Sequence, residues 1–542
     1  MGGGLMQLIA YGAQDIYLTG NPEITFFKIS YKRHTNFAVE PIELNVTGNS
    51  LFGSNVSCLI PKNGDLATKM YLKCDISLSG SGNFAWINRI GVNMIEEIDF
   101  LIGGSIIDRQ YGNWLNIWHQ LTRLEAQEKG YDVMIGNTKE LTELSSNTKN
   151  ATLYVPLKFF FNKFNGLAIP LVALQYHDVR VNIKLLDASK LVVKEGNSSV
   201  NLSISRINLL TNFVFLDSEE RKRFANSAHE YLIEQVQFNG SEPVKSIEEI
   251  YNLNFNHPCK SLFWFIRNRN FNSGKSFLSY KPECVLKNRI GYVDNKILIN
   301  EASIRFVLSK MYSSSGVVSL SLNGSGSSTA SGDSSLTVYN HNSITCGLIT
   351  IRANYNSLTD IDYVNNTANC SASSVSNWEV VNGLTLLQVS TPISDLYNTL
   401  GSSRTTDTNN IGHSNHDVSV YQWNNYGKFL DSSLNPVTSS LLKLNGHERF
   451  SKQNSEFFNY LQSYENYIST PNDGLNIYSF SINPIEHQPS GTCNFSRIDI
   501  SSLHLEIDTD IVNIPNSEFH VFALNYNILR IMSGLGGIAY SN

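Results

Sequence analysis

Residues 69–78 read KMYLKCDISL, and their side chains alternate strictly between two kinds. The apolar side chains, from Met70 to Leu78, fall on one face of an extended chain, and polar or amphipathic ones fall on the other. A period of two residues predicts a strand with one face on a core and one facing outward. The same alternation recurs in HDVRVNIKL (177–185) and SLHLEIDTDI (502–511). We therefore expect antiparallel sheets, since strands of α/β folds are continuously apolar.

Composition supports an all-β chain of more than one domain. The chain has 542 residues, which exceeds one ordinary domain, and 42% of them are hydrophobic, which is ample for packed cores. Only 16% are charged, below the roughly 25% typical of soluble domains, and Asn, Ser and Tyr take up the polar share. The formal net charge is -6 without a long basic run, so we expect no direct nucleic-acid binding. The first 18 residues have no basic start and too short an apolar run for a signal peptide.

Two segments have helical spacing. RQYGNWLNIWHQLTRLEAQEKG (109–130) repeats large apolar residues at helical intervals, and Gly130 suits a helix stop. LDSEERKRFANSAHEYL (216–232) offers Ser218 as a cap. Because strand-like segments run on both sides of the second helix, it predicts the boundary between two all-β halves, with a linker at 217–230.

Residues 312–476 are rich in Ser, Gly, Asn and Thr, which is typical of loops with short strands between them. A polar insertion of this length should lie outside the core and carry an exposed role. Asn323 and Asn365 stand in glycosylation-type sequences, which chance in an Asn-rich chain without a secretory signal explains best; they are kept as possible glycan or exposed-loop positions. His413, His416 and Asp417 could chelate a metal, but no third imidazole or cysteine is near, and solvated side chains are the better interpretation.

HQPSGTCNFSRID (487–499) has the residue types of an active site. Catalysis would require His487 and Cys493 within hydrogen-bond reach and a third group to orient the base, yet no hydrolase motif flanks them. The better interpretation is a structural turn with Cys493 as a small buried thiol and Arg497 with Asp499 in an ion pair or capping backbone groups. The seven cysteines are widely spaced with no CxxC, so we expect reduced thiols, no metal and no cofactor.

Five longer stretches resemble one known family. They are GGGLMQLIAYGAQDIYLTGNPEITFFKISYKRHTNFA (2–38), IPLVALQYHDVRVNI (169–183), FLDSEERKRFANSAHEYLIEQVQ (215–237), SFSINPIEHQPSGTCNFSRID (479–499) and FHVFALNYNILRIMSGLGGIAYSN (519–542). They are similar, in order, to signatures of the major capsid proteins of nucleocytoplasmic large DNA viruses. The stretch from about 312 to 470 resembles nothing we recognise, as expected of variable outer loops.

The resemblance implies two consecutive eight-stranded antiparallel jelly rolls, with a few short helices and long loops in the second. The expected domains are an N-terminal arm (1–25), a first jelly roll (26–216), the linker (217–230) and a second jelly roll (231–542). It also implies a homotrimeric, pseudo-hexagonal capsomer that tiles an icosahedral shell in the virion and assembles in the host cytoplasm. Implied partners are neighbouring capsomers, minor capsid and penton proteins and the internal viral membrane. The enzyme interpretation is disfavoured.

Sixteen signature positions are expected to serve structure or assembly. They are Gly12, Asp15, Tyr17, Pro22, Phe26, Phe27, Arg33, His34, Pro489, Gly491, Cys493, Arg497, Asp499, Asn525, Tyr526 and Arg530. The apolar arm is expected on the inner side of the capsomer, and the glycine-rich end, 532–542, against a neighbour or the inner face. The main alternative is a β-sandwich protein that binds a receptor or carbohydrate through the 312–476 loops.

Overall fold

The computed structural model describes residues 2–82, 84–142, 145–194, 199–267, 426–427, 434–512 and 517–541. Between 268 and 425 it describes only the backbone of seven strands. These are β16 (Ile290–Val293), β17 (Lys296–Ile299), β18 (Asp333–Val338), β19 (Ile349–Ser357), β20 (Asp360–Cys370), β21 (Trp378–Val381) and β22 (Leu384–Gln388). Asn365 lies in β20, while Asn323, His413, His416 and Asp417 lie outside the described residues.

Two antiparallel sheets form the first half of the chain. One has the order β1-β12-β4-β8 with β9 beside β4, the other β2-β3-β10-β6-β7, and β5 pairs with β11 separately. The strands are β1 (Phe37–Asn45), β2 (Thr47–Gly48), β3 (Asn55–Ile60), β4 (Leu66–Gly80), β5 (Phe84–Trp86), β6 (Ile95–Ile102), β7 (Ser105–Tyr111), β8 (Lys149–Pro156), β9 (Ile169–Pro170), β10 (Val179–Leu185), β11 (Val192–Lys194) and β12 (Val200–Leu216).

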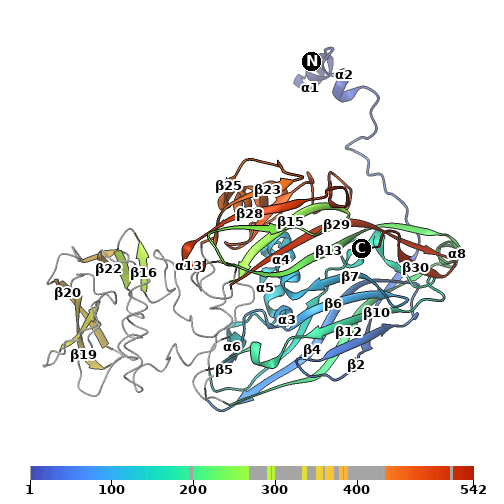
Figure 1. Cartoon of the computed structure of the whole chain (residues 1–542). Helices are drawn as coiled ribbons and strands as arrows, with labels where there is room; N and C mark the ends of the chain where they lie inside the picture. Colours follow the sequence, from blue (N-terminus) through green and yellow to red (C-terminus); the bar gives the residue numbers. More distant parts are fainter. Residues whose placement is uncertain are drawn as a thin grey trace.

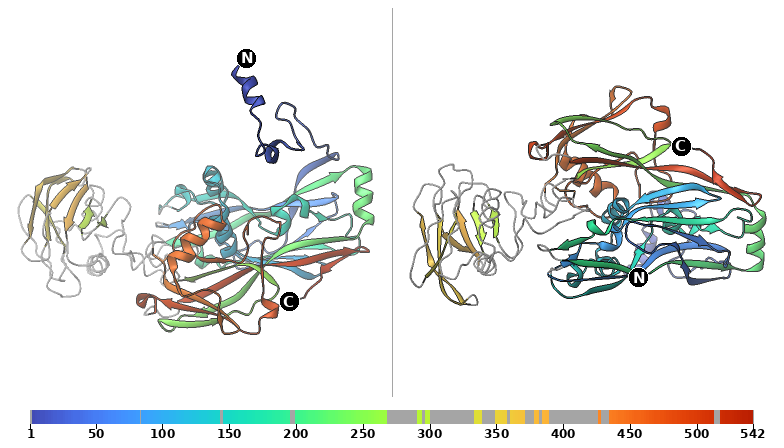
Figure 2. Two further views of the ribbon diagram at one scale, coloured as in Figure 1. Left: turned by 90° about the horizontal axis from the view of Figure 1, so that it is seen from above. Right: turned by 60° about the horizontal axis from the view of Figure 1, so that its bottom comes forward.

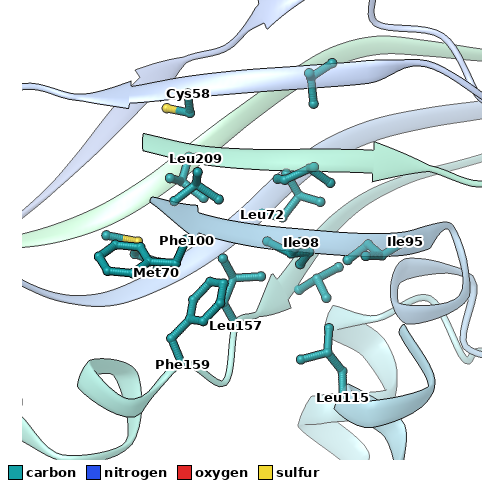
Figure 3. Packing of buried hydrophobic residues seen from close by; sticks show 14 of the residues in the cluster. Cys58, Met70, Leu72, Ile95, Ile98, Phe100, Leu115, Leu157, Phe159 and Leu209 are labelled. Carbon is teal, nitrogen blue, oxygen red and sulfur yellow. The ribbon is translucent and has the colours of Figure 1, made fainter. Parts of the chain in front are cut away.

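The alternation in KMYLKCDISL is confirmed in β4, whose burial alternates along 70–78. Leu72 and Cys74 are fully buried and belong to one hydrophobic cluster. Leu72 lies there beside Phe100 from β6 and Leu209 from β12 (Figure 3). The period-two strand expected over 177–185 is β10, which pairs with both β3 and β6. Gly103 and Gly104, both with positive φ, form the turn between β6 and β7, as the hairpin requires.

Short helices interrupt the first half: α3 (Ile90–Asn93), α4 (Gly112–Thr122), α5 (Glu125–Met134), α6 (Lys139–Thr142), α7 (Phe160–Lys163), and two 3-10 turns, η1 (Asn165–Leu167) and η2 (Ala188–Lys190). The single helix predicted over 109–130 is wrong in detail. Residues 109–111 belong to β7, the helix breaks at Arg123–Leu124, and Gly130 lies inside α5 instead of ending a helix. Arg123 and Leu124 are extended, which separates the buried α4 from the exposed α5.

Helix α8 (Ser218–Asn226) joins the halves, and β13 (His229–Pro243) starts the second. The side chain of Asp217 accepts from the Ser218 amide, so the cap is Asp217 and not Ser218. A helix over 216–232 is too long, because residues from His229 onward pair with β29 as a strand.

The second half also has two sheets. One has the order β13-β29-β15-β26, with β27 beside β15 and β30 beside β29; the other has the order β14-β28-β23-β24, with β25 beside β23. The strands are β14 (Glu248–Asn252), β15 (Pro258–Arg267), β23 (Val437–Leu444), β24 (His447–Glu448), β25 (Gln453–Asn454), β26 (Asn476–Ser479), β27 (Cys493–Asn494), β28 (Ser501–Ile507), β29 (Glu518–Met532) and β30 (Leu535–Ile538). The helical segments are η3 (Phe457–Leu461, a π-helix), α12 (Gln462–Asn466), η4 (Phe495–Arg497) and α13 (Thr509–Val512).

Part of the 312–476 region belongs to the core. Leu442 in β23 and Phe458 in η3 pack into the hydrophobic cluster between the two sheets of the second half. The expectation that the whole region lies outside the core therefore fails for residues 434–476. The apolar residues of VTSSLLKL in β23, of which Val437 and Leu442 are buried, are the signal that the loop-rich composition concealed.

The N-terminal arm leaves the body at β1 and reaches away from both halves (Figure 1; left view of Figure 2). It contains two short helices, α1 (Gly3–Ile9) and α2 (Ile16–Thr19), with no buried residue in either. In the part of the chain that the structure describes, no helix has the length and apolar character to cross a membrane.

Candidate functional site: the junction between the two halves

The two halves share a continuous apolar interface. Trp114, Ile117, Trp118 and Leu121 project from α4 of the first half into a cluster with β15, β26 and β29 of the second. The ring centroids of Trp114 and Phe263 lie 5.1 Å apart, edge to face. In Figure 1, α4 sits between the strands of the two halves. The two tryptophans therefore pack into a core, and that core lies between the two halves.

Strands β15 and β29 are buried on both faces for this reason. Leu262, Trp264 and Ile266 point into the core of the second half, whereas Phe263 and Phe265 point toward α4. In β29 the side chains likewise alternate between these two clusters: Val521 and Ala523 belong to the core of the second half, and Phe522 and Leu524 to the cluster around α4. The sheet that contains β15 and β29 is therefore the shared middle layer of the molecule.

A buried charge cluster lies beside this interface. Glu234 on β13 is 2% exposed and accepts from Lys260 Nζ at 2.5 Å and from Lys163 Nζ at 3.1 Å. Lys163 comes from α7 of the first half, and its ammonium also lies 3.8 Å from the centre of the Trp118 ring. Burial acts to raise the pKa of Glu234, but the two ammonium groups together hold that pKa below its ordinary value. The cluster is consequently a charged triad that ties α7 to β13 and β15.

A second polar link connects β7 to β13. Asp108 on β7 accepts from the Val236 amide at 3.0 Å, and Gln235 donates to the Ile107 carbonyl. Complete burial raises the pKa of Asp108 to about 7. Gln235 in turn accepts from Asn527 at 2.9 Å and from Asn525 at 3.4 Å. The signature residue Asn525 is thus fully buried in the polar network that joins the halves.

The segment 479–499 packs against the same junction. The carbonyl oxygen of Glu486 accepts from Lys260 at 3.1 Å, and the His487 ring lies 4.9 Å from Phe164 of the first half. Gly491 has φ 134°, and a Cβ there would lie 2.6 Å from the Phe480 carbonyl, which explains the glycine. Ser490 anchors the loop through a 2.6 Å hydrogen bond with Ser481 and by accepting from the Asn483 amide at 2.9 Å.

The chemistry-like residues of this segment do not form a catalytic pair. Among the described residues no hydrogen bond joins His487 to Cys493, which instead pairs across strands with Cys259. Burial raises the pKa of the Cys493 thiol, opposite to what a nucleophile needs. Cys493 is half-buried rather than buried, and Pro489 is exposed.

The ion pair predicted between Arg497 and Asp499 is wrong. Both side chains are exposed, and neither has an ion pair or a capping hydrogen bond within the described segments. The backbone there is capped by Asn494, whose side chain accepts from the Ser496 amide at 3.1 Å. Asn494 is a short polar residue next to the turn, a residue type that commonly caps nearby backbone amides. The sequence therefore offered a better candidate for the cap than Arg497 or Asp499.

The glycine-rich C-terminal segment folds back onto its own chain. β30 pairs with β29, Tyr176 donates its amide to Gly534 at 3.0 Å, and His177 contacts Gly536 at 3.0 Å. The segment thus forms an intramolecular clamp on the first half, and its expected contact with a neighbour or the inner face stays a prediction. Arg530 pairs with Glu230 at 2.7 Å on the surface, and the Tyr526 ring lies 5.0 Å from Lys260 Nζ.

The arm, expected over 1–25, extends to residue 36, because the first strand, β1, begins only at Phe37, and its residues lie apart from the junction. The Gly12 amide donates to Asp15 at 2.7 Å, and the side chains of Tyr17, Phe26 and Phe27 are at least 90% exposed. Pro22 and Arg33 are exposed, and His34 contacts its own neighbours in the chain, the Thr35 carbonyl at 2.7 Å and the Phe37 ring at 6.0 Å. The arm thus carries its apolar side chains outside any core of this chain.

The sequence did not point to Glu234, Lys260, Lys163, Asp108 or Gln235 as members of one site. One feature of the sequence does indicate a buried ion pair. Lys260 directly precedes the apolar run SLFWFI in a strand with no exposed residue, and a buried charge needs a buried partner. Which partner it has depends on contacts between residues far apart in the chain. No group of three metal-ligating side chains occurs in the part of the chain whose side chains are described.

Comparison with known proteins identifies the family to which the chain belongs. Residues 220–537 match the family described as large eukaryotic DNA virus major capsid protein, and residues 25–217 match the major capsid protein N-terminus. The chain belongs to this capsid protein family. Similar proteins include capsid protein 1 of Acanthamoeba polyphaga mimivirus, 37% identical, and the major capsid protein of Phaeocystis pouchetii virus, 35% identical, each over all of both chains.

Solved capsid protein structures have the same fold. PBCV-1 VP54 matches with a TM-score of 0.59 and 27% identity over 96% of this chain and 100% of that one. The Faustovirus major capsid protein matches with a TM-score of 0.60 at 11% identity, over 98% and 96% of the two chains, which bears on fold alone. The predictions of a double jelly-roll capsid protein and a virion component are thereby confirmed. The strand number of eight per roll stays a prediction.

Proposed function

We propose that three copies of this major capsid protein form a pseudo-hexagonal capsomer, and that capsomers tile an icosahedral shell. The support is the junction: an apolar interface, a charged triad and a polar network hold the two rolls in one relative orientation. Because each chain carries two similar rolls side by side, a trimer with threefold symmetry has six similar edges and a nearly hexagonal outline. Many weak contacts between such units add up to a stable lattice.

The domain division at 217–230 and the signature positions fit this proposal. α8 lies at the boundary, and Asn525, Tyr526 and Gly491 lie at or beside the junction. We assign these residues to fixing the geometry of the capsomer, with no catalytic role. Asn323 is proposed to lie on an outer loop that is open to glycosylation, and Asn365, which lies in strand β20 and not in a loop, is proposed as a second glycan position.

The arm is proposed to lie on the inner side of the capsomer. Tyr17, Phe26 and Phe27 expose large apolar surface that no described part of the chain covers, which marks an interaction site. Minor capsid or penton proteins and the internal viral membrane are the proposed partners. The genome is not, given the net charge of -6. Assembly is proposed to take place in the host cytoplasm.

Light scattering and negative-stain imaging test the capsomer proposal. The purified chain should have three times the 60.6 kDa chain mass and form hexagonal particles with threefold symmetry. A monomer that binds glycans on an array would support the receptor- or carbohydrate-binding alternative instead. The double variant Phe26→Ser/Phe27→Ser should leave trimers intact and weaken shell assembly. Tyr464→Ser is the matched control, because Tyr464 is 82% exposed on the body.

A further inference from the structure

Two cysteines face each other across neighbouring strands. β27 pairs antiparallel with β15 so that Cys493 is directly opposite Cys259, and Asn494 opposite Pro258. Directly opposite residues point to the same face of a sheet, with Cα atoms roughly 4.5–5.5 Å apart. A disulfide needs Cα atoms roughly 4.4–6.8 Å apart, so the pairing falls within that range. Both thiols are free, and both contact the same apolar cluster.

Among the four cysteines whose side chains are described, only Cys259 and Cys493 face each other in this way. Cys58 is opposite Val181, and Cys74 is opposite Leu153 and Ile207. Cys58 and Cys74 also lie in different sheets of the first half, so neither has a thiol across the ladder. Cys58 and Cys74 therefore serve as controls, because they are buried cysteines of the same chain that have no cysteine opposite them.

We propose that Cys259 and Cys493 form a reversible cross-strand disulfide that fastens the 487–499 segment to β15 under oxidising conditions. The cross-link would join β27, a strand of only two residues, to the strand that carries Lys260. Lys260 also donates to the carbonyl oxygen of Glu486, the residue just before the segment. The disulfide would therefore hold the segment at a second point, Cys493. The loop it closes contains residues 260–492, so it would constrain a long part of the unfolded chain.

The chemistry is a thiol–disulfide exchange with a low-molecular-weight disulfide such as oxidised glutathione. The half-buried Cys493 thiolate attacks one sulfur, forms a mixed disulfide and releases one glutathione thiolate. The Cys259 thiolate then attacks the Cys493 sulfur and releases the second glutathione thiolate. The two protons from the cysteines go to solvent or to the glutathione thiolates. One protein dithiol is oxidised and one glutathione disulfide is reduced.

The reaction is expected to be slow in the folded protein. Burial raises the pKa of both thiols, so little thiolate is present at neutral pH. Opening of the short β27 pairing exposes both sulfurs to the oxidant. The reduced state is therefore retained in a reducing compartment, and the bond accumulates after prolonged exposure to an oxidising one.

The test uses the full-length chain in which Cys284, Cys346 and Cys370 are replaced by Ser, so that only four thiols remain. The trimer is incubated with oxidised glutathione or diamide, then unfolded, alkylated and analysed by peptide mass mapping. A peptide joining Cys259 to Cys493 is expected, together with a rise of about 5 °C in Tm that reducing agent reverses. Cys493→Ala should abolish both effects, and Cys58→Ala should keep them. If all four thiols remain alkylatable with both oxidants, or if Cys493→Ala shows the same rise in Tm, the proposal is wrong.

Discussion

The Glu234→Gln substitution removes the only anion of the buried triad while keeping the shape of the side chain. Glu234, Lys260 and Lys163 are 2%, 0% and 9% exposed, so solvent cannot replace the missing charge. Two ammonium groups would then lie close together without an anionic partner. Removing one member of a buried ion pair costs roughly 3–5 kcal/mol, and we expect that loss in the free energy of unfolding. For a domain of this size, the corresponding fall in Tm is roughly 10 °C.

The matched control is Glu96→Gln. Glu96 pairs with Lys184 at 3.0 Å, a distance similar to that between Glu234 and Lys163, but both side chains are more than 40% exposed. Exposed pairs contribute roughly 0–1 kcal/mol, so this variant should unfold almost like the unchanged protein. Urea denaturation followed by circular dichroism measures both. If Glu234→Gln loses no more stability than Glu96→Gln, the triad does not hold the halves together.

The triple substitution Lys163→Met, Glu234→Leu and Lys260→Met separates stability from geometry. Apolar replacement of a whole buried ion cluster is commonly neutral or stabilising, so the free energy of unfolding should return to near that of the unchanged protein. If the charges serve to specify one orientation of the rolls, the same variant should give fewer well-formed hexagonal particles in negative stain. Normal particles at normal yield would contradict that role.

Further predictions concern the same junction and its loop. Asp108→Asn should remove a pH dependence: the folded pKa of about 7 lies above the ordinary 3.8, so protonation favours the folded state and stability rises as pH falls through 7. Between pH 8 and pH 4, the free energy of unfolding of the unchanged protein should rise by up to about 4 kcal/mol relative to that of the Asn variant. Urea denaturation at each pH measures this, and a difference that does not change with pH would contradict it. Gly491→Ala should destabilise the loop by about 1–3 kcal/mol, whereas Gly446→Ala, whose added Cβ would meet nothing within 4 Å, gives the cost of positive φ alone.

The strands with one buried face were predictable, and those with two buried faces were not. β4, β10 and β28 alternate in sequence because each has one polar face, as in Cys74 beside Asp75. β15 reads as a continuous apolar run because α4 covers the face opposite the core of the second half. No local pattern shows that a helix of the first half supplies that cover. The same limit applies to Glu234, whose partners lie in α7 and β15.

The division of labour at the junction follows from the physics of its two kinds of contact. Apolar burial between α4 and the middle sheet provides most of the attraction, but it is non-directional and permits small rotations of one roll against the other. The triad and the Asp108–Val236 hydrogen bond satisfy buried polar groups in one register only, because any shift leaves a charge or an amide without its partner. A shell protein that repeats one edge geometry many times needs that restriction more than it needs extra stability. The segment HQPSGTCNFSRID therefore resembles an active site because holding a turn in one conformation uses the same polar, small and conformationally special residues that catalysis uses.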